Sequence, residues 1–223
     1  MKACVQYGHT PRIWQQNKSN IPAKPGKDNY NVPKSYRIIT LSSNMLKILE
    51  KLILWHLQDD QEIEQRLKKT QFGFKKGHST EAAISKMINK IQEALEHGEH
   101  IMMGVFLDIQ GAFDNISILS IKRALNKTSA KGMVADWIIN MISNRKIELN
   151  WGNKKIYRTI KKGCPQGGCL IPFLWNLVLD DLLQKFNNSD NIQAFADGLS
   201  LLNIGKTQCG IINNTKIIIM NWC

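Results

Sequence analysis

The stretch NIQAFADGLSLL, residues 191–202, holds one carboxylate, Asp197, in a mainly apolar run, and Gly198 follows it. An Asp-Gly pair between two hydrophobic runs is a strong indicator of a β-hairpin, because both central residues of a type I′ turn need a positive φ. The pattern therefore predicts a hairpin with Asp197 at its tip. Two interpretations of this carboxylate stay open: a turn residue, or a metal ligand held at the tip of a hairpin.

A second carboxylate ends an apolar run earlier in the chain. IMMGVFLDI, residues 101–109, predicts a short buried strand that ends near Asp108. Two carboxylates at strand ends suggest a site for Mg²⁺, which prefers oxygen ligands. Two such ions, about 3.5–4 Å apart, would bind the attacking and leaving oxygens of a phosphoryl transfer. The alternative for Asp108, and equally for Asp114, is that the side chain caps the turn that follows.

The remaining patterns mix helices and strands without the strict alternation of a doubly wound sheet, so we expect an α+β fold. Residues 1–29 are expected to form an irregular basic lead-in. Two helices are predicted from apolar periodicity, one starting at Ser43 and one capped by Ser79 or Thr80 and stopped by Gly98. Their apolar faces are Leu46, Leu49, Ile53 and Leu57 in the first, and Ile84, Met87, Ile88, Ile91 and Leu95 in the second.

Further elements are predicted in the second half of the chain. Helices are expected over about residues 117–126, 133–143 and 170–185. The segments RKIELNW and KKIYRTI predict a hairpin around Gly152 and Asn153. The glycine-rich turn KGCPQGGCL, residues 162–170, offers a backbone surface that a ligand could approach closely, although such a turn is more often a plain loop.

Composition narrows the class of partner. The chain has 223 residues with 30 Lys plus Arg, 18 Asp plus Glu and a net charge of +12. This charge favours a polyanionic partner, nucleic acid first and an acidic membrane surface second, with a merely soluble basic protein as the alternative. The five cysteines are scattered without a C-x-x-C pair, which argues against structural zinc and for reduced thiols.

Nothing in the chain predicts a targeting or membrane segment. The first residues, MKACVQYGHTPRIWQQ, have no apolar core of the kind a signal peptide needs. The longest apolar runs, LIPFLWNLVL and LKILEKLILW, are too short or too interrupted by charge to span a bilayer. We therefore expect a protein of the nucleus, the cytoplasm or both.

Taken in order, several motifs resemble one family. IPAKPGKDNY, KSYRIITLSS, QFGFKKGHST, FLDIQGAFD, SNRKIELNWG, GCPQGGCLIPFLWNLVLDDLL and FADG together resemble the reverse transcriptase of non-LTR retrotransposons, the LINE-like group and its jockey-type insect members. The likeness runs from about Trp14 to Cys223. It implies the fingers and palm of a right-hand polymerase, with fingers over residues 30–100, and over residues 101–223 a palm with an antiparallel sheet packed against helices. On this resemblance the chain lacks the thumb.

The resemblance also implies roles for individual residues. Asp108 and Asp197 would be the catalytic, metal-binding carboxylates for two Mg²⁺ ions, or Mn²⁺. Phe113 would be the steric gate against a ribose 2′-OH. The other implied contacts are Arg37, Lys75, Gln166 and Gly167 with the incoming nucleotide, and Gly163, Pro165 and Gly168 with template and primer. The implied partners are an RNA template, a DNA primer and dNTPs, without a membrane, and the oligomeric state is left open.

One departure from the family pattern bears on activity. The Tyr-X-Asp-Asp box of the family reads Phe-Ala-Asp-Gly here, so Gly198 stands where a second carboxylate is expected. The resemblance therefore implies an RNA-directed DNA polymerase whose activity is impaired. Three hypotheses follow: a working polymerase domain, a catalytically dead remnant, or a pseudo-enzyme that binds nucleic acid.

Overall fold

The structure is a computed structural model that describes residues 1–99, 101–143, 145–151, 154–185 and 191–220. The chain forms two compact units that interleave along the sequence. The first unit is Met1–Arg66 with Gly111–Val178, and the second is Leu67–Gln110 with Leu179–Cys223. The division into fingers and palm at residues 100 and 101 stays a prediction.

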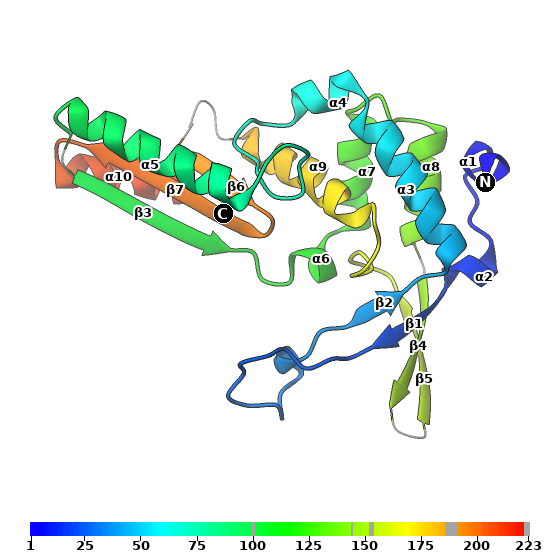
Figure 1. The fold of residues 1–223 in the computed structure, drawn as a ribbon. Coiled ribbons are helices and arrows are strands. Elements are labelled where there is room, and N and C mark those ends of the chain that lie inside the picture. The colour runs from blue at the N-terminus through cyan, green and yellow to red at the C-terminus, as the bar shows by residue number, and fades with distance from the viewer. Residues whose placement is uncertain (100, 144, 152–153, 186–190, 221–223) are drawn as a thin grey trace. The chain divides into compact units, whose positions relative to one another are not determined.

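The second unit is a three-stranded antiparallel sheet packed with two helices (Figure 1). Its strands lie in the order β3-β7-β6, with β3 at Ile101–Asp108, β6 at Ile192–Phe195 and β7 at Gly198–Gly205. Helix α5, Thr80–Glu96, packs against β6 and β7, and helix α10, Gln208–Met220, against β7 and β3. The predicted hairpin and the predicted antiparallel sheet covered by helices are both confirmed.

Strand β3 differs from its prediction in burial. The continuous apolar run predicted a buried strand, yet none of residues 101–108 is buried, and Phe106 is 73% exposed. The reason is its place in the described sheet, where β3 pairs with β7 alone and forms an edge. Buried side chains of this sheet come instead from β6 and β7, among them Ile192, Leu199 and Leu201.

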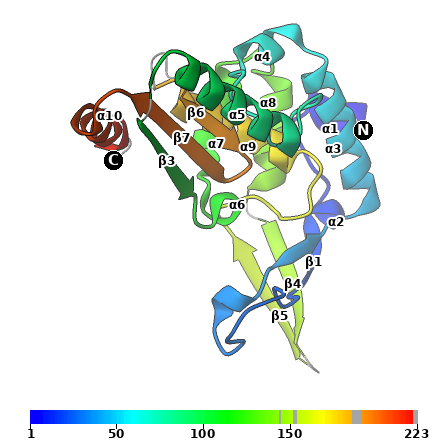
Figure 2. The ribbon, with the colours of Figure 1, turned by 60° about the vertical axis from the view of Figure 1, so that its left-hand side comes forward.

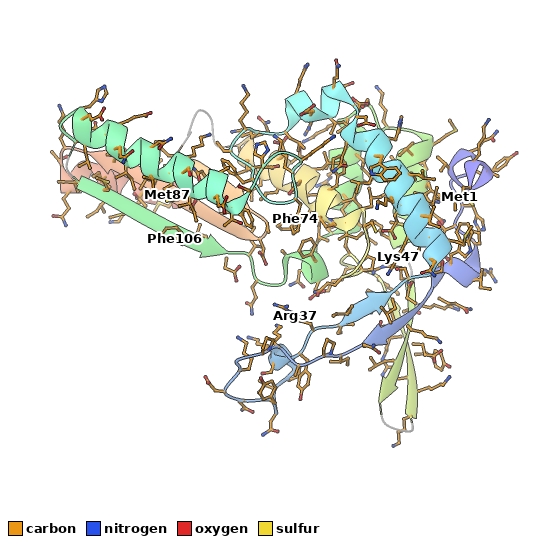
Figure 3. The ribbon with its side chains drawn as sticks, in the orientation of Figure 1. Met1, Arg37, Lys47, Phe74, Met87 and Phe106 are labelled. Carbon is orange, nitrogen blue, oxygen red and sulfur yellow. The ribbon has the colours of Figure 1, made fainter. Side chains whose placement is uncertain are left out.

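Helix α5 begins and ends where the sequence predicts, but its packing face is narrower. The Ser79 side chain accepts a hydrogen bond from the Ala82 N–H at 3.1 Å, and Gly98 has a φ of +75° just beyond the helix. Of the five predicted apolar positions, Met87 and Ile91 are half-buried, while Ile84, Ile88 and Leu95 are exposed. Figure 3 shows Met87 on the side of α5 that faces the sheet. The contact face is completed by the small residue Ala94, which periodicity of large apolar residues does not reveal.

The first unit contains most of the helices and a four-stranded sheet. Its helices are α1 Lys2–Gln6, α2 Arg12–Gln15, α3 Asn44–Gln58, α4 Gln61–Arg66, α6 Ala112–Asn115, α7 Ile118–Asn126, α8 Met133–Ile142 and the first part of α9 Ile171–Leu183, with a 3₁₀ turn at Pro33–Ser35. The strands β1 Gln16–Asn20, β2 Ile39–Leu41, β4 Arg145–Trp151 and β5 Lys154–Ile160 lie in the order β2-β1-β4-β5. Figure 2 shows β1, β4 and β5 of this sheet together. Only the β1–β4 pairing among these is parallel.

Most elements of this unit follow the sequence pattern. The predicted apolar face of α3, Leu46, Leu49, Ile53 and Leu57, is buried, and the Ser43 side chain accepts a hydrogen bond from the Leu46 N–H. Strands β4 and β5 pair as the predicted hairpin, whose turn residues, Gly152 and Asn153, lie outside the described residues.

The lead-in is less irregular than predicted. Residues 1–29 contain α1, α2 and β1, and β1 pairs with both β2 and β4. Its sequence, QNKSN, has no hydrophobic alternation, so the strand arises from pairing with two distant neighbours rather than from local propensity. Among the described residues, no helix is both long and apolar enough to cross a membrane.

Candidate active site

The turn between β6 and β7 holds Asp197 at the tip, as predicted, but with a different geometry. Phe195 pairs with Gly198, so the two loop residues are Ala196 and Asp197, and Gly198 is already the first residue of β7. Ala196 has a φ of +55°, whereas neither Asp197 nor Gly198 lies in the left-handed region. A type I′ turn needs a positive φ at both central residues, so the prediction of an Asp-Gly type I′ turn is wrong.

The same register brings the two predicted catalytic carboxylates to neighbouring strand ends. Asp108, the last residue of β3, pairs with Gly198, the residue that follows Asp197. The Ile109 N–H donates a hydrogen bond to the Asp197 carbonyl at 3.0 Å, which continues the ladder past the end of β3. Both carboxylate side chains are exposed. Accessible carboxylates at two neighbouring strand ends are the type of ligand that a hard divalent cation such as Mg²⁺ prefers.

Within the part of the chain that the structure describes, the two aspartates are not joined by a third acidic ligand. Among the described residues, no group of three His, Cys, Asp or Glu side chains is arranged to hold a metal ion. Gly198 stands beside the pair and contributes no side chain. A Cβ atom added at Gly198 would lie 3.4 Å from the Phe195 carbonyl oxygen, an ordinary contact distance, and its φ is not left-handed. The backbone therefore has room for an aspartate at this position.

The segment that carries Lys75 lies against the same turn. Residues 70–72 run parallel to β6: the Ala194 N–H donates to the Thr70 carbonyl at 2.9 Å, and the Phe72 N–H donates to the Ala194 carbonyl at 2.8 Å. The sequence did not reveal this pairing, because three residues are too few to show a strand periodicity. The Lys75 ammonium lies 3.5 Å from the Leu67 carbonyl.

In the first unit, the glycine-rich loop is fastened to the short helix α6. The Cys164 N–H donates to the Phe113 carbonyl at 2.7 Å, and the Gly163 N–H donates to the Ile116 carbonyl at 2.9 Å. Gly163 has a φ of +72°, and a Cβ there would lie 2.4 Å from the Asp114 carbonyl oxygen. Only glycine fits this position, because both the conformation and the space exclude a side chain.

The middle of the loop is held by one side chain and one strand. The Gln166 amide donates from Nε2 to both carboxylate oxygens of Asp114, at 3.0 and 3.1 Å. The Gln166 carbonyl accepts from the Thr40 N–H of β2 at 2.9 Å, and a Cβ at Gly167 would lie 2.8 Å from the Thr40 carbonyl oxygen. Asp114 was considered in the sequence only as a capping residue, and the bond to Gln166 could not be seen there.

The end of the loop rests on a buried carboxylate that the sequence did not indicate. Glu50 of α3 is fully buried, and its Oε2 accepts from the Leu170 N–H at 3.3 Å. Burial raises the pKa of the Glu50 carboxyl above its usual value, although the bond from Leu170 opposes the shift. The Gly168 position lies directly over this carboxylate, with a Cβ placed 3.0 Å from Oε2.

The buried thiol of this loop, Cys164, is not set up as a nucleophile. Cys164 is buried, and this burial raises its pKa to about 12, although the nearby Arg145 guanidinium favours the thiolate. Arg145 is itself buried and donates to the carbonyls of Ile142 and Gly163, at 3.0 and 2.7 Å. Both residues therefore belong to the framework that shapes the loop.

The structure thus assembles the predicted residues in two groups. The second unit contains Asp108 and Asp197 at one sheet end, with the Lys75 segment beside the same hairpin. The first unit contains Gly163, Pro165, Gln166, Gly167 and Gly168 in one loop, fastened to the helix of Phe113. The Phe113 ring lies 5.7 Å, centroid to centroid, from the buried Trp175 ring of α9. Arg37 is exposed and comes two residues before β2, the strand that borders the loop (Figure 3).

Comparison with known proteins identifies the family. Residues 21–223 match the model of the reverse transcriptase (RNA-dependent DNA polymerase) family, and the chain belongs to that family. Enzymes of this family use divalent metal ions.

Relatives and solved structures agree with this assignment. The chain is 30% identical over 181 residues to the RNA-directed DNA polymerase from mobile element jockey of Drosophila melanogaster, covering 80% of this chain and 19% of that protein. It is 30% identical over 183 residues to the Pol polyprotein of the type-1 retrotransposable element R1 of Bradysia coprophila, covering 82% of this chain and 18% of the relative. The chain therefore spans about a fifth of the length of these relatives.

The fold is also that of solved reverse transcriptases. Apo telomerase from Candida tropicalis superposes with a TM-score of 0.65 at 8% sequence identity, over 94% of this chain and 42% of the telomerase chain. At that identity the likeness shows the fold alone. It supports the expected α+β reverse transcriptase architecture.

Proposed function

We propose that this chain is the nucleotide-adding core of an RNA-directed DNA polymerase from a non-LTR retrotransposon, impaired by the loss of one carboxylate at Gly198. In the proposed reaction a primer 3′-OH attacks the α-phosphate of a dNTP on an RNA template, and pyrophosphate leaves. The observation that carries the proposal is the register of β3 and β7, which places Asp108 beside the turn that bears Asp197.

The residues of the second unit would supply charge at the reacting phosphate. Asp108 and Asp197 would hold Mg²⁺, with two ions expected in an intact family member and Mn²⁺ as an alternative. A bound divalent cation would neutralise the charge of the transferring phosphoryl group. Lys75 would bind the triphosphate as a point charge, without the bidentate geometry of an arginine.

The residues of the first unit would orient the nucleotide and the template. Phe113 rests on Trp175, which restricts its ring and suits the proposed role of excluding a 2′-OH. Gln166 has its amide nitrogen directed to Asp114, which leaves the amide oxygen as the acceptor available to a ligand. Arg37 would reach the phosphates, and the glycines at 163, 167 and 168, with Pro165, would form the backbone surface along template and primer.

Primer extension on an RNA template with Mg²⁺ tests this proposal. Because the chain spans about a fifth of its relatives, we would place it in the jockey polymerase in exchange for the matching segment. Three chimeras are compared: the chain as written, Gly198→Asp, and Gly198→Asp with Asp108→Ala. We expect weak or no extension by the first, extension by the second and none by the third. Extension by the third chimera would refute the role of Asp108, and no extension by any chimera would refute the proposed polymerase.

A nucleic-acid-binding pseudo-enzyme is the second candidate, favoured by Gly198 and the net charge of +12. If the chain binds an RNA–DNA duplex through its phosphates, affinity should fall steeply as salt rises. Salt-dependent binding together with inactivity of all three chimeras would favour this candidate, and a flat salt response would exclude it.

A further inference from the structure

Gly73 packs directly against the backbone of the turn that carries Asp197. Among the glycines of the second unit, it is the one where an added Cβ atom would come closest to a neighbouring atom. A Cβ added at Gly73 would lie 2.2 Å from the Ala196 nitrogen, 3.0 Å from the Ala196 Cα and 3.1 Å from the Phe195 carbonyl carbon. All three are backbone atoms, which cannot rotate away as a side chain can. An alanine at residue 73 therefore forces the chain segments apart.

The segment that carries Gly73 is fixed on its other sides. Thr70, Gln71 and Phe72 are buried, and the two hydrogen bonds to Ala194 hold residues 70–72 along β6. Before them, the Lys68 N–H donates to the Asp180 carboxylate of α9 at 3.0 Å. The Lys86 ammonium lies 5.8 Å from the centre of the Phe72 ring. With one side held in place, the hairpin turn is the partner that would have to shift if a side chain were added at residue 73.

Both sides of the contact carry an unusual backbone. Phe74 and Ala196 each have a φ of +55°, and they are the two non-glycine residues with positive φ among the described residues. Ala196 directly precedes Asp197, and Phe74 directly precedes Lys75. Residues with side chains are sterically strained in this conformation, so the surrounding structure must hold them there. The Gly73 contact lies between the two.

We infer that Gly73 is a positioning residue for the metal-binding turn, and that it fixes Lys75 and Asp197 as one rigid group. The inference rests on the proposed function, since it assigns Lys75 to the nucleotide phosphates and Asp197 to the cation. Through Gly73, the segment 70–75 and the turn 195–198 share one backbone contact. The backbone that carries Lys75 and the backbone that carries Asp197 therefore keep a fixed spacing before any ligand binds.

Gly73→Ala in the full chain tests the contact, with Gly104→Ala as the matched control. Neither glycine has a left-handed φ, so alanine is conformationally allowed at both positions. A Cβ at Gly104 would meet only the Phe106 ring, at 3.4 Å. We expect Gly73→Ala to speed hydrogen exchange at the Phe72 and Ala194 amides and Gly104→Ala to leave both unchanged. Equal protection in the two variants would overturn the inference.

Mn²⁺ titration of the same proteins, followed by electron paramagnetic resonance, tests the consequence for metal binding. We expect Gly73→Ala to lower the affinity for Mn²⁺ by about tenfold or more, because residues that support a metal ligand have effects of this size. The Gly104→Ala control should keep the affinity of the unsubstituted chain. Unchanged affinity in Gly73→Ala would overturn the positioning role. If the unsubstituted chain does not bind Mn²⁺, the proposed metal site fails, while the exchange measurement still decides the contact.

A reciprocal measurement on the unsubstituted chain covers the case in which Gly73→Ala does not fold. Coupling between two sites is mutual, so Mn²⁺ bound at Asp197 should slow exchange at the Phe72 amide. The Ile109 amide, which donates to the Asp197 carbonyl, reports binding itself. Slower exchange at Ile109 without any change at Phe72 would show that the turn and the segment 70–75 are uncoupled and would overturn the inference.

Discussion

The turn at residues 195–198 and the loop at residues 163–168 both carry predicted catalytic-site residues, yet they are held in different ways. The turn is the end of a β ladder, so strand register places it, and a glycine from outside the hairpin, Gly73, packs against its backbone. The loop belongs to none of the β ladders that the structure describes. Isolated hydrogen bonds fasten it to the α6 segment and to β2, and glycines stand where its backbone meets theirs. The difference shows that a glycine is required in one region and not in the other: the backbone has room for a side chain at Gly198 but none at Gly163.

The largest expected effect comes from Gly163→Ala. Its φ of +72° and a Cβ only 2.4 Å from the Asp114 carbonyl oxygen require the loop to separate from α6. We expect a loss of about 3 kcal/mol in the free energy of unfolding. Urea denaturation measures it, and Gly104→Ala is the control. A loss no larger than that of the control would show that the loop is not fixed by this contact.

Asp114→Asn is expected to have the next largest effect, on nucleotide binding. An asparagine amide nitrogen facing Gln166 favours a flipped Gln166 amide, which then presents nitrogen instead of oxygen to a ligand. In the Gly198→Asp chimera we expect the KM for dNTP to rise about tenfold with little change in kcat. Asp59→Asn, the same change at an exposed position, is the control. An unaltered KM would remove Gln166 from the nucleotide site.

Ala196→Gly should stabilise the turn. Glycine adopts a φ of +55° without the steric cost that alanine has, so we expect a gain of about 1 kcal/mol in unfolding free energy. The same substitution two residues earlier, Ala194→Gly, removes a buried methyl group from β6 and should destabilise instead. Thermal unfolding distinguishes the two signs. A loss of stability in Ala196→Gly would mean that the left-handed conformation of Ala196 does not destabilise this turn.

Gly198→Asp is expected to change stability least, and in a metal-dependent way. The new carboxylate would stand directly opposite Asp108 in the ladder, so repulsion should cost about 0.5 kcal/mol in metal-free buffer. Binding of Mg²⁺ to the folded site, as proposed, should reverse the loss. Gly198→Asn, which adds the same shape without the charge, should lack the repulsion and should gain less stability from Mg²⁺ than Gly198→Asp. Identical Mg²⁺ responses in the two variants would contradict a contribution of residue 198 to the metal site.

Several local features were predictable because they depend on residues close together in the chain. The buried face of α3, the Ser79 cap and the Gly98 stop of α5 follow from spacing and capping chemistry alone. The hairpin that presents Asp197 was equally visible. The family motifs, taken in order, identified the reverse transcriptase family, which the family model then confirmed.

Other features depend on which distant segments lie side by side, and the tertiary structure alone decided them. The sequence favoured Gly198 as a turn residue, but pairing of Phe195 with Gly198 moved the positive φ to Ala196. An apolar run predicted a buried β3, but its edge position leaves its residues half-buried or exposed. Gln166 meets Asp114, and Gly73 meets Ala196, across long stretches of chain. Local patterns specify conformation and burial tendency, whereas register and packing between remote segments determine which residues touch.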